Sequence, residues 1–173
     1  GSGLMGWANL CVSLEPYNYQ CKIIGFDTFQ GSTGVTSKDN TSDKIRRREK
    51  EYNANNYEDI LKTIKVFDMD RPLNHIKKIE VVKGDLSKTI PNYLKKNKQQ
   101  TVRILHLSMN LYLPTFNGLK YFLPRMVKGS IVVIDGLNHA APGCLEALKE
   151  NVDLSKVNLR TFDYFPNYTY FTI

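Results

Sequence analysis

Two acidic side chains follow apolar runs at places where a nucleotide could bind. Asp27 ends the run KIIGFD at residues 22–27, and Asp85 follows the run IEVVKG at residues 79–84. If these runs are parallel strands, both acids stand at carboxyl ends, where open α/β sheets bind ligands. An acid so placed after a glycine-rich turn can accept hydrogen bonds from both hydroxyls of a ribose. Each acid also has a local explanation, because Asp27 suits a turn and Asp85 can cap a helix that begins at Leu86.

Side chains with acid–base chemistry follow two further apolar runs. One run contains His106 and ends at Ser108, and the next ends at Asp135, with His139 on the segment that follows. A histidine on a loop beyond a strand is well placed to act as a general base, so we predict that role for His139. A surface histidine would give the same pattern. His106 lies inside an apolar run, which favours packing in a core.

The chain begins with Gly1-Ser2-Gly3 in front of an apolar run from Leu4 to Leu14. Glycines before a helix allow a ligand to approach the backbone closely, and a helix N-terminus favours a negatively charged group. Three small residues at the start of a chain are also a common remnant of cloning. The spacing alone leaves both interpretations open.

Apolar runs alternate with helix-like runs along most of the chain, which predicts a parallel sheet with right-handed crossovers. The predicted strands are rich in isoleucine and valine and nearly continuous in apolar residues, as is typical of strands covered on both faces. They cover residues 22–27, 79–84, 102–108 and 130–135. The predicted helices cover residues 4–14, 57–67, 86–96, 115–126 and 142–151.

The last part of the chain predicts an antiparallel hairpin. Strand-like runs at residues 157–163 and 168–173 are separated by Tyr164-Phe165-Pro166-Asn167. We therefore predict one domain over residues 1–173, a three-layer, doubly wound, mostly parallel α/β sheet that ends in this hairpin. Residues 31–56 are rich in Gly, Ser, Asn and charge, and we expect a mobile surface loop or a lid there.

The composition of the 173 residues is that of a globular protein. Apolar residues make up 42% and charged residues 24%, which excludes a disordered, collagen-like or coiled-coil chain. No run approaches the roughly 20 apolar residues of a membrane span, and no secretory signal is visible, so we expect no membrane partner. Cys11, Cys21 and Cys144 form neither a disulfide framework nor a zinc spacing. Free thiols in a reducing cytoplasm are the simplest interpretation.

The net charge of +7 comes from 24 basic against 17 acidic residues. The basic residues concentrate at residues 44–50 and 95–98. Such runs suit an anionic partner such as nucleic acid, or an ordinary solvated surface. Interleaved acids and the lack of a nucleic-acid-binding motif favour the surface, so we consider nucleic acid an unlikely partner.

Several segments, in order along the whole chain, resemble the macrocin O-methyltransferase (TylF-like) family. They are GFDTF at 25–29, KGDLSKTIP at 83–91, LYLPT at 111–115, LPRMVKGSIVVID at 123–135, and Asn-His with Pro-Gly at 138–143. This family consists of class I methyltransferases that use S-adenosylmethionine. The resemblance implies methyl transfer to an oxygen of a small acceptor, with a sugar-containing metabolite as the expected partner and a homo-oligomer as a further possibility.

The resemblance also implies a role for each strand end. Gly1 and Gly3 would lie beside the methionine part of S-adenosylmethionine, and Asp27 would hold its ribose. Gly84, Asp85 and Leu86 would line the adenine pocket. Ser108, on the strand that carries the family's carboxylates at the site of methyl transfer, would be a further cofactor-binding residue. Asp135 would be a catalytic residue and a metal ligand, with Asn138 and His139 near the acceptor.

Three departures from the family pattern affect the metal. The family commonly has Asp-x-Asp where this chain has Ser108-Met109-Asn110, an acid where it has Gly136, and a Glu where it has Cys144. Magnesium needs hard oxygen ligands, typically carboxylates. We therefore expect no tightly held divalent cation. The departures also leave open a catalytically impaired methyltransferase-like domain with a binding or structural role, and the charge leaves open a nucleic-acid-binding or nucleic-acid-modifying protein.

The resemblance implies one more strand. In this fold the first, central strand runs directly into the glycine-rich loop, and the sequence begins inside that loop. A sheet without its central strand would leave two unpaired edges in the core. Either that strand precedes Gly1 in a longer chain, which we expect, or it comes from elsewhere.

Overall fold

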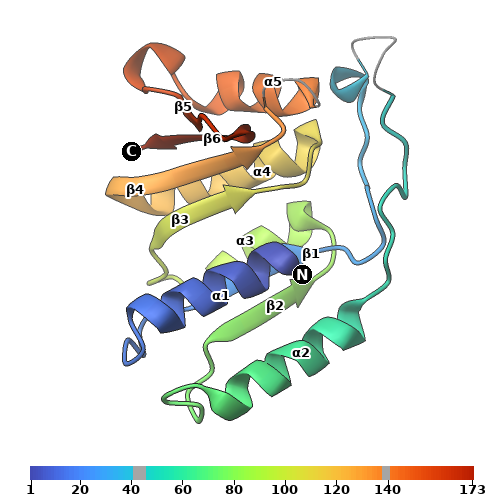
Figure 1. Cartoon of the computed structure of the whole chain (residues 1–173). Coiled ribbons are helices and arrows are strands. Elements are labelled where there is room, and N and C mark those ends of the chain that lie inside the picture. The colour runs from blue at the N-terminus through green and yellow to red at the C-terminus, as the bar shows by residue number, and fades with distance from the viewer. Residues whose placement is uncertain (41–45, 138–140) are drawn as a thin grey trace. The chain divides into compact units, whose positions relative to one another are not determined.

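A computed structural model describes residues 1–40, 46–137 and 141–173. Contacts between residues divide the chain into two compact units (Figure 1). The first unit consists of Gly1–Phe29 and Ala54–Asp85, and the second of Gln30–Asn53 and Leu86–Ile173. The expectation of one domain over residues 1–173 stays a prediction, as does the strand before Gly1.

The first unit is a parallel strand pair with two helices. Its elements are α1 (Ser2–Leu14), β1 (Ile23–Asp27), α2 (Tyr57–Asp70) and β2 (Ile79–Lys83). In the pairing of β1 with β2, Asp27 lies opposite Lys83. Leu4, in the first turn of α1, packs on Gly25 so closely that a Cβ there would lie 3.0 Å from the leucine side chain. The start of α1 and the carboxyl ends of both strands therefore lie at the same end of this unit, as Figure 1 shows.

The second unit contains a four-stranded sheet of order β3-β4-β6-β5. Its helices and strands are α3 (Leu86–Lys96), β3 (Val102–Leu107), α4 (Tyr112–Phe122), β4 (Met126–Asp135), α5 (Pro142–Asn151), β5 (Arg160–Phe162) and β6 (Phe165–Thr172), with short 3-10 turns η1 (Ser37–Asp39), η2 (Leu123–Arg125) and η3 (Leu154–Lys156). Strands β3 and β4 are parallel, and β6 is antiparallel to both β4 and β5. The predicted antiparallel pair at the end of the sheet is therefore confirmed.

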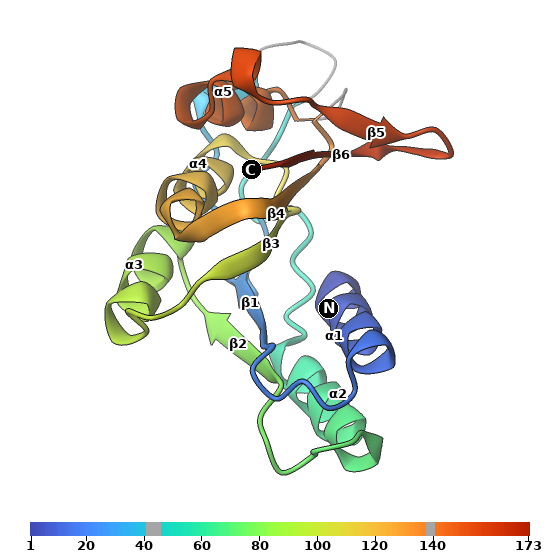
Figure 2. The same cartoon turned by 90° about the vertical axis from the view of Figure 1, so that its left-hand side faces the viewer.

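Helices cover one face of this sheet. Figure 2 shows α3 and α4 on the same side of β3 and β4, and α5 packs against α4. Along β4, Ser130, Val132 and Ile134 are buried while the alternating residues are half-buried, so the strand is less evenly covered than the apolar run predicted. Gly118 of α4 allows the helix close to β3, since a Cβ there would lie 2.7 Å from the side chain of Leu107.

Several details differ from the predicted elements, among them the earlier starts of α4 at Tyr112 and of β4 at Met126. Helix α4 ends at Phe122, before the predicted residue 126, because Pro124 cannot donate a helical hydrogen bond. The turn of the hairpin is at residues 163–164, not 164–167, and the aromatic rings of Phe162 and Tyr170 stack across it at 5.0 Å. In α2, Ile60 is buried whereas its neighbour Leu61 is exposed.

The segment predicted to be the loosest contains a fully buried acid. Asp39, in η1, is 1% exposed. Its Oδ1 accepts the backbone N–H of Tyr112 at the start of α4 (2.6 Å), and its Oδ2 accepts the N–H and the hydroxyl of Thr36 (2.8 Å each). Gly143, in the first turn of α5, leaves room for this carboxylate, because a Cβ there would collide with Asp39 Oδ1. This part of the segment has few apolar residues, and the polar contacts of Asp39 hold it in place.

Two neighbours extend this attachment to the surface. Lys38 forms an ion pair with Glu150 of α5 (2.5 Å), and its Nζ lies 3.9 Å from the centre of the Tyr112 ring. The Tyr112 hydroxyl donates to the other carboxylate oxygen of Glu150 (2.7 Å). These contacts raise the pKa of Lys38 and lower that of Glu150. Both groups are exposed, so Asp39 carries most of the stabilisation.

We predict that Asp39→Ala lowers the free energy of unfolding by about 2–4 kcal/mol, because the buried N–H of Tyr112 loses a charged acceptor. Urea unfolding followed by circular dichroism measures the change. Asp163→Ala, which removes an exposed acid from the hairpin turn, is the matched control and should change stability by no more than about 0.5 kcal/mol. Equal effects of the two substitutions would show that Asp39 does not anchor the segment.

Candidate functional site

The carboxyl ends of β1 and β2 present two exposed acids. Asp27 Oδ1 accepts the N–H of Phe29 (2.7 Å), which fixes the carboxylate while Oδ2 stays available. The N–H of Gly84 donates to the backbone oxygen of Asp27 (2.9 Å), so the two strand ends stay together beyond the last paired residues. Asp85 follows at once and is also exposed. Both acids that the sequence singled out in this unit therefore lie at the same edge.

The start of α1 is a helix N-terminus with almost no side chains. Gly1 is its N-cap residue, and no side chain caps the helix. The first backbone N–H groups of such a helix have no partner within it and favour an anionic group. Because Leu4 packs on Gly25, these N–H groups belong to the same end of the unit as Asp27. An acid for a ribose and a helix N-terminus for a carboxylate fit S-adenosylmethionine.

Leu86, the third residue expected at the adenine, is the first residue of α3 in the second unit. Its side chain is 7% exposed and belongs to the apolar face of that helix with Ile90, Tyr93 and Leu94. The position of Leu86 on the buried face of α3 is enough to explain why this residue is apolar. A contact with a cofactor stays a prediction.

Ser108 and Asp135 meet at the carboxyl ends of β3 and β4. The parallel register pairs Leu107 with Ile134, so the next residues, Ser108 and Asp135, also lie side by side. The Ser108 hydroxyl donates to Asp135 Oδ2 (3.1 Å). The strand ends thus bring together two residues that are 27 positions apart in the sequence, as the predicted sheet required.

Asn110 lies directly over Gly136 at this edge. Its backbone is left-handed, with φ of 53°, and a Cβ on Gly136 would lie only 2.6 Å from Asn110 Oδ1. Among the described residues, this buried oxygen has no hydrogen-bond partner. The amide of Asn110 therefore occupies the space that a side chain at position 136 would need, and it offers an acceptor for a ligand hydroxyl.

His106 lies on the face of β3 that also carries Ser108, because residues two apart in a strand share a face. Its ring packs edge-on against Tyr168 of β6, with centroids 5.6 Å apart. Burial lowers the pKa of His106, although the charge of Asp135 opposes this shift. A neutral imidazole beside Asp135 is a possible base that our sequence interpretation assigned to core packing. The spacing between His106 and Ser108 was the signal that could have found it. His139 and Asn138 lie outside the described residues.

The donors at this edge do not fit a tightly held magnesium ion. Asp135 supplies one carboxylate and already accepts a hydrogen bond from Ser108, and Asn110 adds a neutral oxygen. Within residues 1–40, 46–137 and 141–173, no group of three or more His, Cys, Asp or Glu side chains could hold a metal ion. Magnesium sites usually depend on carboxylates and bound phosphates.

One of the two basic runs lines a groove in the second unit. Lys95 and Lys98 lie there with Lys120 and Arg125, above Pro91, Leu94, Tyr121 and Pro124. Arg125 donates to the backbone oxygen of Lys98 (2.5 Å). These residues lie in α3 and just after it, and at the end of α4 and in η2, where the chain returns toward the amino ends of the strands. The groove is therefore separate from the edge that carries Ser108 and Asp135.

A family sequence model tests the resemblance found in the sequence. The model of the macrocin-O-methyltransferase (TylF) family matches residues 14–168. The chain belongs to the macrocin-O-methyltransferase family. The match confirms the resemblance found in the sequence. No curated protein sequence matches the chain at a significant level.

Solved structures of methyltransferases resemble this member of the macrocin-O-methyltransferase family. CalS11, a calicheamicin methyltransferase, is 27% identical with a TM-score of 0.86, covering 96% of this chain and 65% of that chain. The apo structure of CalS11, described as a TDP-rhamnose 3′-O-methyltransferase, is 28% identical with a TM-score of 0.76, covering 96% of this chain and 64% of that one.

The O-methyltransferase NovP is 18% identical with a TM-score of 0.63, covering 87% of this chain and 59% of that chain, and supports the fold alone. The chain thus spans less than two thirds of the length of each of these proteins. The predicted α/β methyltransferase fold is confirmed. No helix in the described part of this chain is long and apolar enough to cross a membrane.

We predict that magnesium binds more weakly than about 1 mM, since one carboxylate and neutral oxygens make a poor site. Calorimetry with magnesium chloride measures this. The double substitution Ser108→Asp with Asn110→Asp adds two carboxylates and should tighten binding at least roughly tenfold. Micromolar binding to the unchanged chain that disappears in Asp135→Asn would contradict the prediction.

Proposed function

We propose that this protein is an S-adenosylmethionine-dependent methyltransferase that methylates a hydroxyl of a small, sugar-containing molecule. The match of the macrocin-O-methyltransferase family over residues 14–168 carries the proposal. The acids and hydroxyls at the strand ends support it, because they are the groups that such a reaction needs. A location in the cytoplasm and a homo-oligomer stay predictions from the sequence.

The first unit is proposed to hold the cofactor. When bound, S-adenosylmethionine supplies an activated methyl group. Asp27 Oδ2 accepts hydrogen bonds from the ribose hydroxyls, while Oδ1 keeps its bond to Phe29. The N–H groups at Gly1–Gly3 face the carboxylate of the methionine part. Gly84 and Asp85, with Leu86, line the adenine.

The second unit is proposed to hold the acceptor. A sugar hydroxyl is hardly ionised at neutral pH, so it must lose its proton to a base as the methyl group is transferred. Asp135 accepts a hydrogen bond from this hydroxyl, and Ser108 keeps the carboxylate in place. Asn110 Oδ1 accepts from a second hydroxyl of the sugar. His139 is the base predicted from the sequence, and the neutral imidazole of His106 is a second candidate.

Accurate placement of the hydroxyl is the main source of rate in this proposal. The oxygen and the methyl carbon must approach in line, and holding both reactants in that geometry can supply much of the acceleration. No step requires a metal ion bound by the described residues. The acceptor class is inferred from CalS11, which is described as acting on TDP-rhamnose.

Two experiments test the activity in the full-length protein. Calorimetry with S-adenosylmethionine measures cofactor binding, and methyl transfer to TDP-rhamnose, as a probe of the sugar class, measures turnover. Binding without transfer to any sugar-containing acceptor would favour the alternative of an impaired, methyltransferase-like binding domain. A salt-dependent gel shift tests the nucleic-acid alternative, which the comparisons do not favour.

We predict that Asp27→Asn weakens binding of S-adenosylmethionine by about 1.5–3 kcal/mol, the worth of charged hydrogen bonds to a ribose. The asparagine oxygen can still accept the N–H of Phe29, so the fold should be kept. Calorimetry measures the affinity, and Asp70→Asn, at the exposed end of α2, is the control for lost charge. Unchanged affinity in Asp27→Asn would remove Asp27 from the cofactor site.

We predict that Asp135→Asn lowers kcat at least roughly 100-fold, because the acceptor hydroxyl loses its charged hydrogen-bond partner. Binding of S-adenosylmethionine should stay within about twofold, since no role in cofactor binding is assigned to Asp135. Ser108→Ala should lower kcat by a smaller factor, because it only orients the carboxylate. Equal losses of cofactor affinity and kcat in Asp135→Asn would place this residue with the cofactor and contradict the assignment.

A further inference from the structure

Two cysteines of the first unit lie within reach of each other. Cys11 is in the last turns of α1, and Cys21 is in the connection that leads into β1. Their sulfur atoms are 3.0 Å apart, and both residues are half-buried. A disulfide has an S–S distance of about 2.05 Å, so the bond requires the sulfurs to move by roughly 1 Å.

The connection between α1 and β1 is folded so that Cys21 faces the helix. The Asn18 side chain accepts the backbone N–H groups of Gln20 (3.1 Å) and Cys21 (3.0 Å), and its Nδ2 donates to Glu15 (2.7 Å). These three bonds fix the connection around one side chain. These hydrogen bonds of Asn18 therefore hold Cys21 in place next to the helix that carries Cys11.

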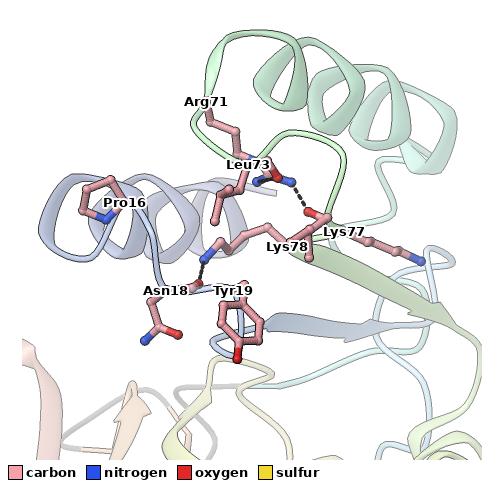
Figure 3. A pocket seen from close by; sticks show the side chains of 8 residues that line it. Pro16, Asn18, Tyr19, Arg71, Leu73, Lys77 and Lys78 are labelled. Carbon is pink, nitrogen blue, oxygen red and sulfur yellow. Dashed lines mark hydrogen bonds between the residues drawn. The ribbon is translucent and has the colours of Figure 1, made fainter.

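A buried cation lies beside the pair. Lys78, the residue before β2, is 4% exposed, and its Nζ donates to the backbone oxygen of Asn18 (2.6 Å) (Figure 3). The same Nζ is 3.9 Å from Cys11 Sγ. A cationic side chain beside a partly exposed cysteine is the usual setting of a reactive thiol.

The two cysteines have different surroundings. Burial, together with the neighbouring Cys11, raises the pKa of Cys21 to about 11, although Lys78 opposes this. Because the Lys78 Nζ contacts Cys11 Sγ, we assign Cys11 as the sulfur that reacts first and Cys21 as the sulfur that resolves the product. Cys144 is different: it is fully buried in the second unit, contacts Thr115 (3.4 Å), and burial raises its pKa to about 11.

We propose that Cys11 and Cys21 are a site of reversible oxidation at which hydrogen peroxide forms a disulfide. The Cys11 thiolate attacks one oxygen of the peroxide, the O–O bond breaks, and the hydroxide that leaves takes up the thiol's proton as water. Cys21 then attacks the sulfur of the resulting sulfenic acid, the S–O bond breaks, and the second hydroxide leaves as water with the proton of Cys21. Each sulfur loses one electron and each peroxide oxygen gains one.

The disulfide would fasten the end of α1 to the start of β1. It closes a loop of only about ten residues, which restricts the unfolded chain. The inference is independent of the proposed methyl transfer, because it rests on the contacts of the sulfurs and Lys78 alone. Because the thiol pair is half-buried, a small oxidant and a small reductant can both reach it.

Treatment of the reduced full chain with one equivalent of hydrogen peroxide tests the proposal. Alkylation, then cleavage after tyrosine with chymotrypsin, separates Cys11 from Cys21, because Tyr17 and Tyr19 lie between them. We expect the two fragments to be linked, Cys144 to be alkylated as before, and dithiothreitol to reverse the link. The oxidised protein should melt about 5–10 °C higher than the reduced one. Cys11 that is oxidised without a link to Cys21, or thiols that stay fully alkylatable, would overturn the proposal.

Three variants sharpen the result. Cys144→Ser should form the link as the unchanged chain does. Cys21→Ser should leave a sulfenic acid on Cys11 that dimedone traps, and no linked fragments. Lys78→Met, checked for folding by circular dichroism, should slow the reaction with peroxide roughly tenfold, because Cys11 loses the positive charge beside it. An unchanged rate would show that Lys78 does not activate Cys11.

Discussion

Parallel pairing of neighbouring strands is the constraint on which the candidate site depends. Two parallel strands that leave the sheet at the same edge bring their following residues together, however far apart these are in the sequence. In the first unit this places Asp27 beside Gly84, whose N–H donates to the backbone oxygen of Asp27. In the second unit it places Ser108 beside Asp135. A shift of one residue in either register would turn these side chains to the opposite face of the sheet.

Asp39 imposes a second constraint on the same edge of the second unit. The chain between β3 and α4, and the chain between β4 and α5, both end at helix N-termini that meet this buried carboxylate. A helix N-terminus carries partial positive charge, so one acid can stabilise two of them. Tyr112 donates its N–H to the carboxylate, and Gly143 leaves room for it. The segment that contains Asp39 thereby holds the starts of α4 and α5.

The acceptor edge combines one carboxylate with neutral oxygens. Asn110 adopts a left-handed backbone and fills the space over Gly136, so a larger residue at position 136 would displace it. Such a set of groups orients hydroxyls by hydrogen bonds and binds a hard cation poorly. This chemistry suits a sugar, which offers several hydroxyls in a fixed arrangement. The proposed methyl transfer therefore relies on placement and a base, with His106 and His139 as candidates.

The sequence by itself determined the elements and the residues that follow them. The bounds of α3 and α5 agree with the predicted ranges, and β1 and β2 agree to within one residue, because apolar periodicity and local breakers are properties of short segments. From these strand ends Asp27, Asp85, Ser108 and Asp135 could be selected. Only the tertiary structure decided what depends on contacts between distant segments: Asp39 beneath α4, His106 against Tyr168, and Cys11 beside Cys21 and Lys78. A one-dimensional pattern shows which residues share a strand or helix face, but burial and partners arise only when those faces pack together.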